Sequence, residues 1–123
     1  MGLFFVVPLK QKPILIVCDD LFMANELTVR ITKARGEVVH AANTLEALER
    51  LKIVDCVAAV LMQQADIAAV AARLRESHVP CCILDKAARK PVSVFGEDTV
   101  AVDDTDLVVP TLQALLAQRD KPR

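Results

Sequence analysis

One short apolar run constrains the fold of this 123-residue chain more than any other feature. Residues 14–18 read ILIVC and are followed at once by Asp19 and Asp20. Five consecutive apolar residues are too few for a helix and lack the alternation of a half-exposed strand, so the run predicts a parallel strand buried on both faces. Ligand sites of open α/β sheets lie at the carboxyl ends of the strands, and the two aspartates therefore mark the expected functional edge.

The rest of the chain alternates apolar runs with segments of helical period. Further strands are predicted at 37–42, 56–62, 81–84 and 99–102. Helices are predicted at 21–35, from the cap at 43 to about 51, from 67 to a point before Pro80, and from Asp106 or Leu107 to about Arg119. This order predicts a flavodoxin-like three-layer α/β sandwich, with a five-stranded parallel sheet in the order 2-1-3-4-5. Residues 86–98 have no clear period, so we expect a shortened or irregular fourth helix there.

Short polar and glycine signals mark the ends of these helices. Asp20 and Asn43 precede two of them and are expected to cap them, Asn43 as a capping-box pair with Glu46. Gly36 follows the first helix, where a left-handed residue is wanted. The apolar face of the second helix is expected to consist of Leu45, Leu48 and Leu51.

The length suits one domain, which we place at residues 13–119. Residues 1–12 form an expected N-terminal arm and residues 120–123 a polar tail. The apolar stretch Leu3–Val7 in the arm is too short to span a membrane and makes a poor signal peptide, because no basic residues precede it. It is either an added strand, a loose arm or an oligomer contact.

Composition argues against several classes of partner. The net charge is −1 without a basic stripe, and Trp and Tyr are absent, so nucleic-acid binding has little support. The four cysteines lack CxxC spacing and fall in predicted strands, which indicates buried, reduced thiols in a cytoplasmic protein. They are Cys18, Cys56, Cys81 and Cys82.

The stretches ILIVCDD and EVVHAANTLEALERL resemble the receiver domain of bacterial two-component response regulators, and the resemblance covers about residues 12–119. It implies a phosphorelay module in which an acidic pair after the first strand helps to hold Mg²⁺. It also implies a phospho-accepting Asp ending the third strand, a Thr or Ser ending the fourth, and a Lys-Pro pair ending the fifth.

Only the acidic pair, Asp19 and Asp20, matches that pattern. The accepting position aligns with Val60, counted from Asp55, and the Thr or Ser position aligns with Asp85. The Lys-Pro pair aligns with Asp103 and Asp104. Val60 offers no nucleophile, and aspartates would repel a phosphoryl group rather than hold it. The chain therefore resembles a degenerate receiver, or pseudo-receiver.

Aspartates should gather at the carboxyl edge of the sheet, and they allow two interpretations. They can cap helices and loops or face solvent, as structural carboxylates often do. Alternatively, they form a weak Mg²⁺ or other divalent-cation site, or the site of a small-molecule sensor. The residues concerned are Asp19 and Asp20, joined by Asp85 and Asp103.

We find no nucleophile–base pair and no glycine-rich phosphate loop, so no enzymatic activity is expected. The favoured function is a non-catalytic signalling module that is not phosphorylated on the usual Asp. It would bind a protein partner or a second copy of itself, without nucleic acid or membrane. Three apolar residues in the irregular segment form either the partner-binding patch or core filler. They are Val92, Val94 and Phe95.

Overall fold

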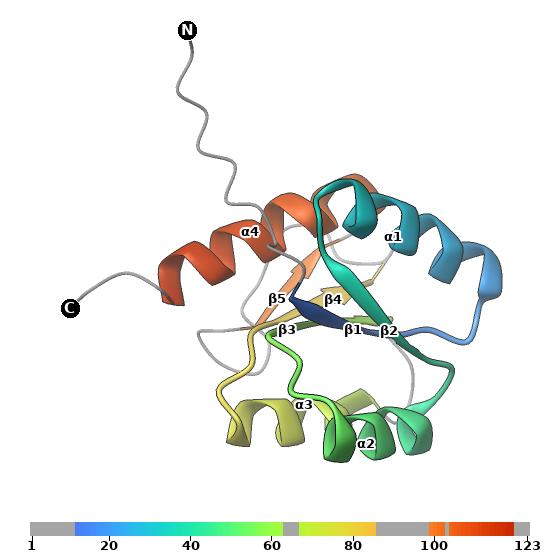
Figure 1. Ribbon diagram of the computed structural model, residues 1–123, viewed down its shortest axis with the longest axis vertical. Helices are drawn as coiled ribbons and strands as arrows, with labels where there is room; N and C mark the ends of the chain where they lie inside the picture. The colour runs from blue at the N-terminus through green and yellow to red at the C-terminus, as the bar shows by residue number, and fades with distance from the viewer. Residues whose placement is uncertain (1–11, 63–66, 86–98, 103, 120–123) are drawn as a thin grey trace, which may run out of the picture.

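The computed structural model describes residues 12–62, 67–85, 99–102 and 104–119. Its five parallel strands form one sheet in the order β2-β1-β3-β4-β5, which confirms the predicted fold (Figure 1). The strands are β1 (Pro13–Val17), β2 (Glu37–Ala41), β3 (Ala58–Met62), β4 (Cys81–Leu84) and β5 (Thr99–Val102). The expected fourth helix, the arm up to residue 11 and the polar tail lie outside the described residues.

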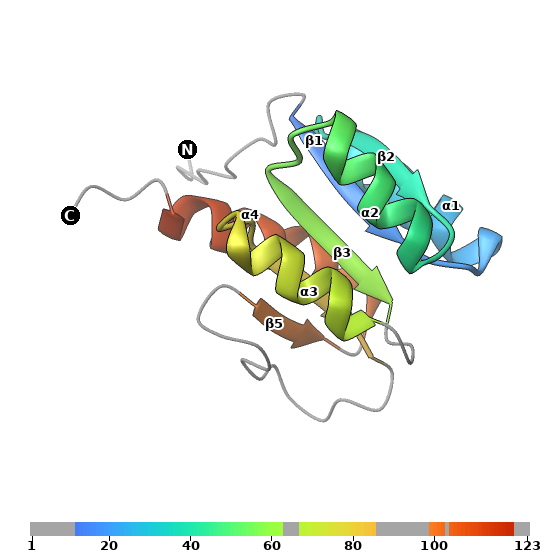
Figure 2. The same cartoon turned by 90° about the horizontal axis from the view of Figure 1, so that it is seen from below.

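Helices cover both faces of the sheet, as Figures 1 and 2 show. On one face lie α1 (Leu21–Lys33) and α4 (Val108–Arg119), and α4 is preceded by the short 3₁₀ helix η1 (Thr105–Leu107). On the other face lie α2 (Thr44–Ile53) and α3 (Ile67–Glu76). In the part of the chain described, no helix is long and apolar enough to cross a bilayer.

The apolar run of β1 supplies both layers of the core. Ile14 and Ile16 point toward the α1 and α4 layer, whereas Leu15 and Val17 point toward the α2 and α3 layer. All four are completely buried, because β1 lies between β2 and β3 in the sheet. Each such side chain stabilises the fold by about 1.5–3 kcal/mol through burial, which explains why the run has no polar position.

Three local expectations are corrected by the structure. Leu45 is 70% exposed, and Ala47 is the buried residue of α2. The third strand begins at Ala58, which pairs with Ile14, and not at Cys56. The last helix begins as a 3₁₀ turn at Thr105, one residue before the earlier predicted start at Asp106, because Asp104 caps that turn.

The left-handed residue after α1 is Arg35, with φ 69°, in place of the expected Gly36. The Arg35 N–H donates to the Thr32 carbonyl, 2.9 Å, and the Gly36 N–H donates to the Ile31 carbonyl, 2.8 Å. These two bonds form the Schellman ending of a helix, in which the left-handed position is one residue earlier than Gly36. His78 (φ 58°) takes the same place after α3.

Replacing Arg35 with glycine should stabilise the domain by about 0.5–1 kcal/mol, because glycine adopts positive φ without the strain of a Cβ. His78→Gly should act in the same direction, since the exposed His78 side chain is not needed for the turn. Urea denaturation measures both effects. Gly36→Ala is the comparison variant, and a loss of stability in Arg35→Gly would contradict the assignment.

Candidate functional site

The carboxyl end of β1 is held by hydrogen bonds from β2. The Cys18 N–H donates to the Ala41 carbonyl, 3.0 Å, and His40 Nε2 donates to the Cys18 carbonyl, 2.9 Å. The Cys18 thiol contacts the Asp20 carbonyl at 3.3 Å. The two aspartates therefore leave the sheet from a fixed point, and both are exposed.

Asp20 is the N-cap of α1, as expected. Its Oδ1 accepts hydrogen bonds from the N–H groups of Phe22, at 3.0 Å, and Met23, at 3.3 Å. Asn43 caps α2 in the same manner, and its Oδ1 accepts from the Glu46 N–H at 2.9 Å. One oxygen of Asp20 is therefore already engaged by the helix, which supports the capping interpretation for this residue.

Asp20→Ala should destabilise the domain by about 1 kcal/mol, because two N–H groups at the start of α1 lose their acceptor. Asp20→Asn is the matched control, since asparagine caps equally well but carries no charge. Thermal unfolding at neutral pH compares the two variants. Equal losses in both would show that the charge, and not the cap, is what stabilises α1.

The other aspartates at this edge are only partly described. Asp85 follows β4, is half-buried, and its N–H donates to the Val102 carbonyl at 2.8 Å. Asp103 lies outside the described residues, and Asp104 Oδ1 accepts from the Asp106 N–H at 2.9 Å. Within the described ranges, no three His, Cys, Asp or Glu side chains are grouped to hold a metal ion. The weak Mg²⁺ site at Asp19 and Asp20 remains a prediction, tested by calorimetric titration with millimolar Mg²⁺.

Val60 lies inside the sheet rather than at its edge. It is 1% exposed and stands level with Ile16 on β1 and Cys82 on β4. The strand continues for two residues and ends at Met62, whose Sδ lies 3.4 Å from the Cys18 Sγ. The last residue of β3, next to the acidic pair Asp19 and Asp20, is therefore Met62, whose side chain is half-buried.

The four cysteines are reduced and buried, as expected. Burial raises the pKa of Cys82 to about 12. Burial, helped by the charge of Asp55, raises the pKa of Cys56 to about 11. Burial also raises the pKa of Cys18, and the nearby Asp20 and Asp19 charges act in the same direction. A raised pKa means little thiolate at neutral pH, so none of these three is prepared to act as a nucleophile.

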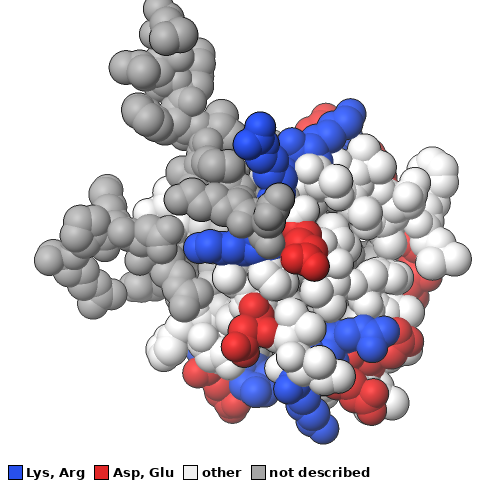
Figure 3. All heavy atoms as spheres, in the orientation of Figure 1, with Lys and Arg blue, Asp and Glu red and all other residues white. Residues whose placement is uncertain are grey.

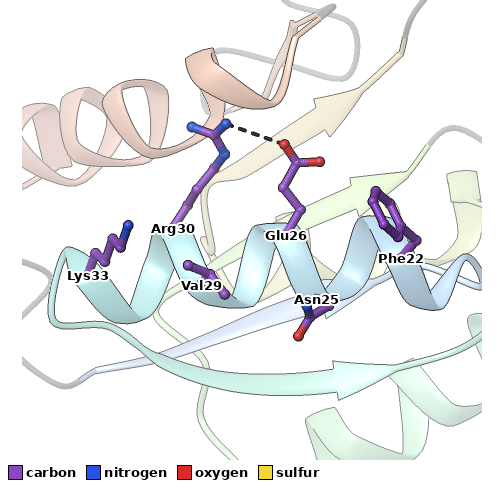
Figure 4. A pocket seen from close by; sticks show the side chains of 6 residues that line it. All are labelled: Phe22, Asn25, Glu26, Val29, Arg30 and Lys33. Carbon is purple, nitrogen blue, oxygen red and sulfur yellow. Dashed lines mark hydrogen bonds and ion pairs between the residues drawn. The ribbon is translucent and has the colours of Figure 1, made fainter.

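An ion-pair network joins α1 to η1, and our sequence reasoning missed it. Arg30 contacts Asp106 at 2.6 Å. It also contacts Glu26 at 3.3 Å, as Figure 4 shows. Thr105 Oγ1 donates to the same Glu26 carboxylate at 3.2 Å. The spacing of Glu26 and Arg30 indicates a pair within the helix. The contact with Asp106 depends on how α1 and η1 pack and has no local signal.

A surface hollow of about 500 Å³ runs along the outer side of α1. The sequence did not predict this hollow. Its six lining residues all come from this helix, as Figure 4 shows. They are Phe22, Asn25, Glu26, Val29, Arg30 and Lys33. The partner-binding residues expected from the sequence, Val92, Val94 and Phe95, lie outside the described residues.

No protein-family model matches the chain, and no curated protein matches it in sequence. Solved structures do share its fold. The orphan response regulator HP1043 of H. pylori has a TM-score of 0.68 and 11% identity, over 87% of this chain and 98% of that one. The receiver domain of Francisella response regulator 1452 has a TM-score of 0.69 and 14% identity, over 89% and 99%. The pseudo-receiver domain of CikA, solved by NMR, has a TM-score of 0.64 and 17% identity, over 91% and 99%. The chain therefore has the flavodoxin-like fold of receiver domains.

Proposed function

We propose that this chain is a non-catalytic signalling module of receiver type that works without phosphorylation and acts by binding protein. The observation that carries the proposal is the apolar carboxyl end of β3. There, beside Asp19 and Asp20, the strand ends in Met62, and Val60 is buried two residues earlier. A thioether or an alkyl side chain cannot form an acyl phosphate.

The proposal does not depend on the choice of aligned residue. Residues 56–65 read CVAAVLMQQA and contain no Asp or Glu, so no shift of the alignment within this stretch supplies an acceptor carboxylate. The positions expected to hold the phosphoryl group are also unsuited to it. Asp85 follows β4, and Asp104 follows β5 with its carboxylate turned to the N–H of Asp106. Neither is a cation that could neutralise a phosphoryl group.

A receiver-type module that is neither phosphorylated nor catalytic would act by binding another protein. The fold is shared with a response regulator described as an orphan and with a domain described as a pseudo-receiver, which supports a signalling role. Buried, reduced thiols are typical of a reducing compartment, and we place the module in the cytoplasm. The partner is a protein of the pathway or a second copy of this chain.

Incubation with acetyl phosphate and Mg²⁺, read by intact-mass spectrometry, tests the proposal. We expect no phosphoryl adduct, and no rise in thermal stability with beryllofluoride, which mimics a bound phosphoryl group. A receiver domain with an intact acceptor Asp, treated in parallel, is the positive control. A stoichiometric adduct that hydroxylamine removes would overturn the proposal, because it would show a working acyl-phosphate switch.

A further inference from the structure

The carboxyl edge of the sheet carries exposed apolar side chains as well as aspartates. Each of the described helices starts at this edge, because each follows a parallel strand. Leu21 and Phe22, the first two residues of α1, are 75% and 84% exposed, and Leu107, the last residue of η1, is 41% exposed. We call these three residues the edge patch. Large apolar side chains that gather at one exposed place mark an interaction site.

Two polar contacts hold η1 against α1. Thr105 Oγ1 donates to the Glu26 carboxylate at 3.2 Å, and Arg30 contacts Asp106 at 2.6 Å. Phe22 lies one turn before Glu26, and Figure 4 shows both side chains on the same side of α1. Phe22 therefore lies on the side of α1 that faces η1, and the edge patch spans the boundary between the two elements.

The surroundings of the edge patch are acidic. Residues 18–29 contain three carboxylates, residues 104–107 contain two more, and neither stretch has a lysine or an arginine. In the whole chain 15 basic residues nearly balance 16 acidic ones, so the excess of acid is a property of this edge. The five acidic residues are Asp19, Asp20, Glu26, Asp104 and Asp106.

The basic residue that follows on α1 does not offset this charge. Arg30 is already paired with Glu26 and Asp106, and all of the other four carboxylates except that of Asp106 remain without it. On the right-hand flank of Figure 3, where Figure 1 shows the start of α1, the surface consists of uncharged and acidic side chains. The edge patch therefore has an acidic rim.

An acidic rim around apolar side chains selects a partner that is both basic and apolar. The rim repels the phosphates of nucleic acids and of anionic lipids. An extended peptide would need a free strand edge for pairing, whereas this surface is made by side chains of a helix and a 3₁₀ turn. An amphipathic helix with basic residues beside its apolar face matches both parts of this surface.

We propose that the edge patch and its acidic rim bind a basic amphipathic helix of a protein partner. This inference rests on the interaction module proposed above and adds the chemistry of its partner. Apolar side chains of the bound helix would cover Phe22 and Leu107, and its basic side chains would approach Asp19 and Asp104, which are both exposed.

A designed peptide of leucine and lysine at helical spacing, with one tryptophan, is the probe. The chain itself has no tryptophan, so the emission of the peptide reports binding directly. We expect saturable binding that weakens as the salt concentration rises, because salt screens exposed charges. The matched peptide with glutamate in place of each lysine should bind at least about tenfold more weakly. Equal binding of the two peptides, or no binding of the lysine peptide, would overturn the inference.

A pair of apolar variants locates the contact. Phe22→Ser should weaken binding of the lysine peptide at least about tenfold, as loss of a central aromatic usually does. Ile53→Ser is the matched control, because Ile53 is 79% exposed but ends α2 at the opposite edge of the sheet. Both side chains are exposed, so both variants should fold, and circular dichroism checks this. Equal losses in the two variants would show that the peptide does not bind at the edge patch.

A pair of charge variants tests the rim. Asp19→Asn combined with Asp20→Asn removes two charges while asparagine keeps the cap of α1, and should weaken binding at least about threefold. Its control is Asp55→Asn combined with Glu76→Gln, which removes two charges at the opposite edge of the sheet. If the control loses as much binding, the rim does not select the partner and the inference is wrong. The phosphorylation test above is independent, so a failure here with no phosphoryl adduct would reject this inference alone.

Discussion

Val60→Asp should unfold the domain instead of creating a phosphorylation site. Val60 is 1% exposed between Ile16 and Cys82, so an aspartate there would have apolar neighbours on both adjacent strands. A buried carboxylate without a partner costs about 3–5 kcal/mol, and the lost methyl groups add about 1–2 kcal/mol. Domains of this size have a total stability of only about 5–15 kcal/mol. Circular dichroism and urea denaturation at neutral pH should show an unfolded or barely folded chain.

Two companion variants separate the causes of that loss. Val60→Ala removes the methyl groups without adding charge and should cost about 2 kcal/mol. Met62→Asp places the carboxylate at the half-buried end of β3, beside Cys18, and should leave the domain folded. A folded Val60→Asp protein with the stability of Val60→Ala would contradict the position of Val60 in the sheet.

Raising the pH above about 9 should destabilise the domain through its buried thiols. Burial raises the pKa of Cys56 to about 11 and that of Cys82 to about 12, against an ordinary value of 9.0. The folded chain therefore binds more protons than the unfolded chain above pH 9, and stability falls as the pH rises. The stability that these thiols contribute is complete below pH 9 and is lost progressively as the pH rises from 9 to the folded pKa, about 11 for Cys56 and about 12 for Cys82. Each thiol contributes a slope of about 1.4 kcal/mol per pH unit in that window.

Urea denaturation at pH values from about 7 to about 10.5, under reducing conditions, measures this slope. To isolate the effect of the two thiols, the comparison needs a variant that lacks them. Cys56→Ala combined with Cys82→Val should be less stable at neutral pH because of altered packing, but its stability should fall less steeply with pH. Parallel curves for this variant and the wild type would show that the two thiols do not control alkaline unfolding.

The topology could be predicted from the sequence because each strand and helix is indicated by several consecutive residues. The run ILIVC has no polar position, which is typical of a strand buried on both faces of a sheet. Because such runs alternate with helical segments along the chain, only a few strand orders are possible for the sheet. Predictions that depended on a single residue were less secure. Arg35 takes the left-handed position one residue before Gly36, since the hydrogen bonds of the helix end, and not the identity of one glycine, fix where the turn falls.

The candidate site was predictable only in part, for similar reasons. The capping roles of Asp20 and Asn43 follow from local sequence, and the structure confirms both. The place of Val60 within β3 depends on where the strand ends, and counting from Asp55 does not determine that end. The contact of Arg30 with Asp106 joins residues far apart in the sequence, so no local pattern indicates it.

The two faces of the sheet are completed at different stages of synthesis. The face covered by α2 and α3 has its helices and four of its five strands once Leu84 has been made. The opposite face needs α4, whose Val108, Leu112 and Leu116 complete its core. A chain released by the ribosome before Val108 would expose that apolar face to solvent. Proteases and chaperones that recognise exposed apolar surface should therefore remove such truncated products, while chains that include α4 escape them.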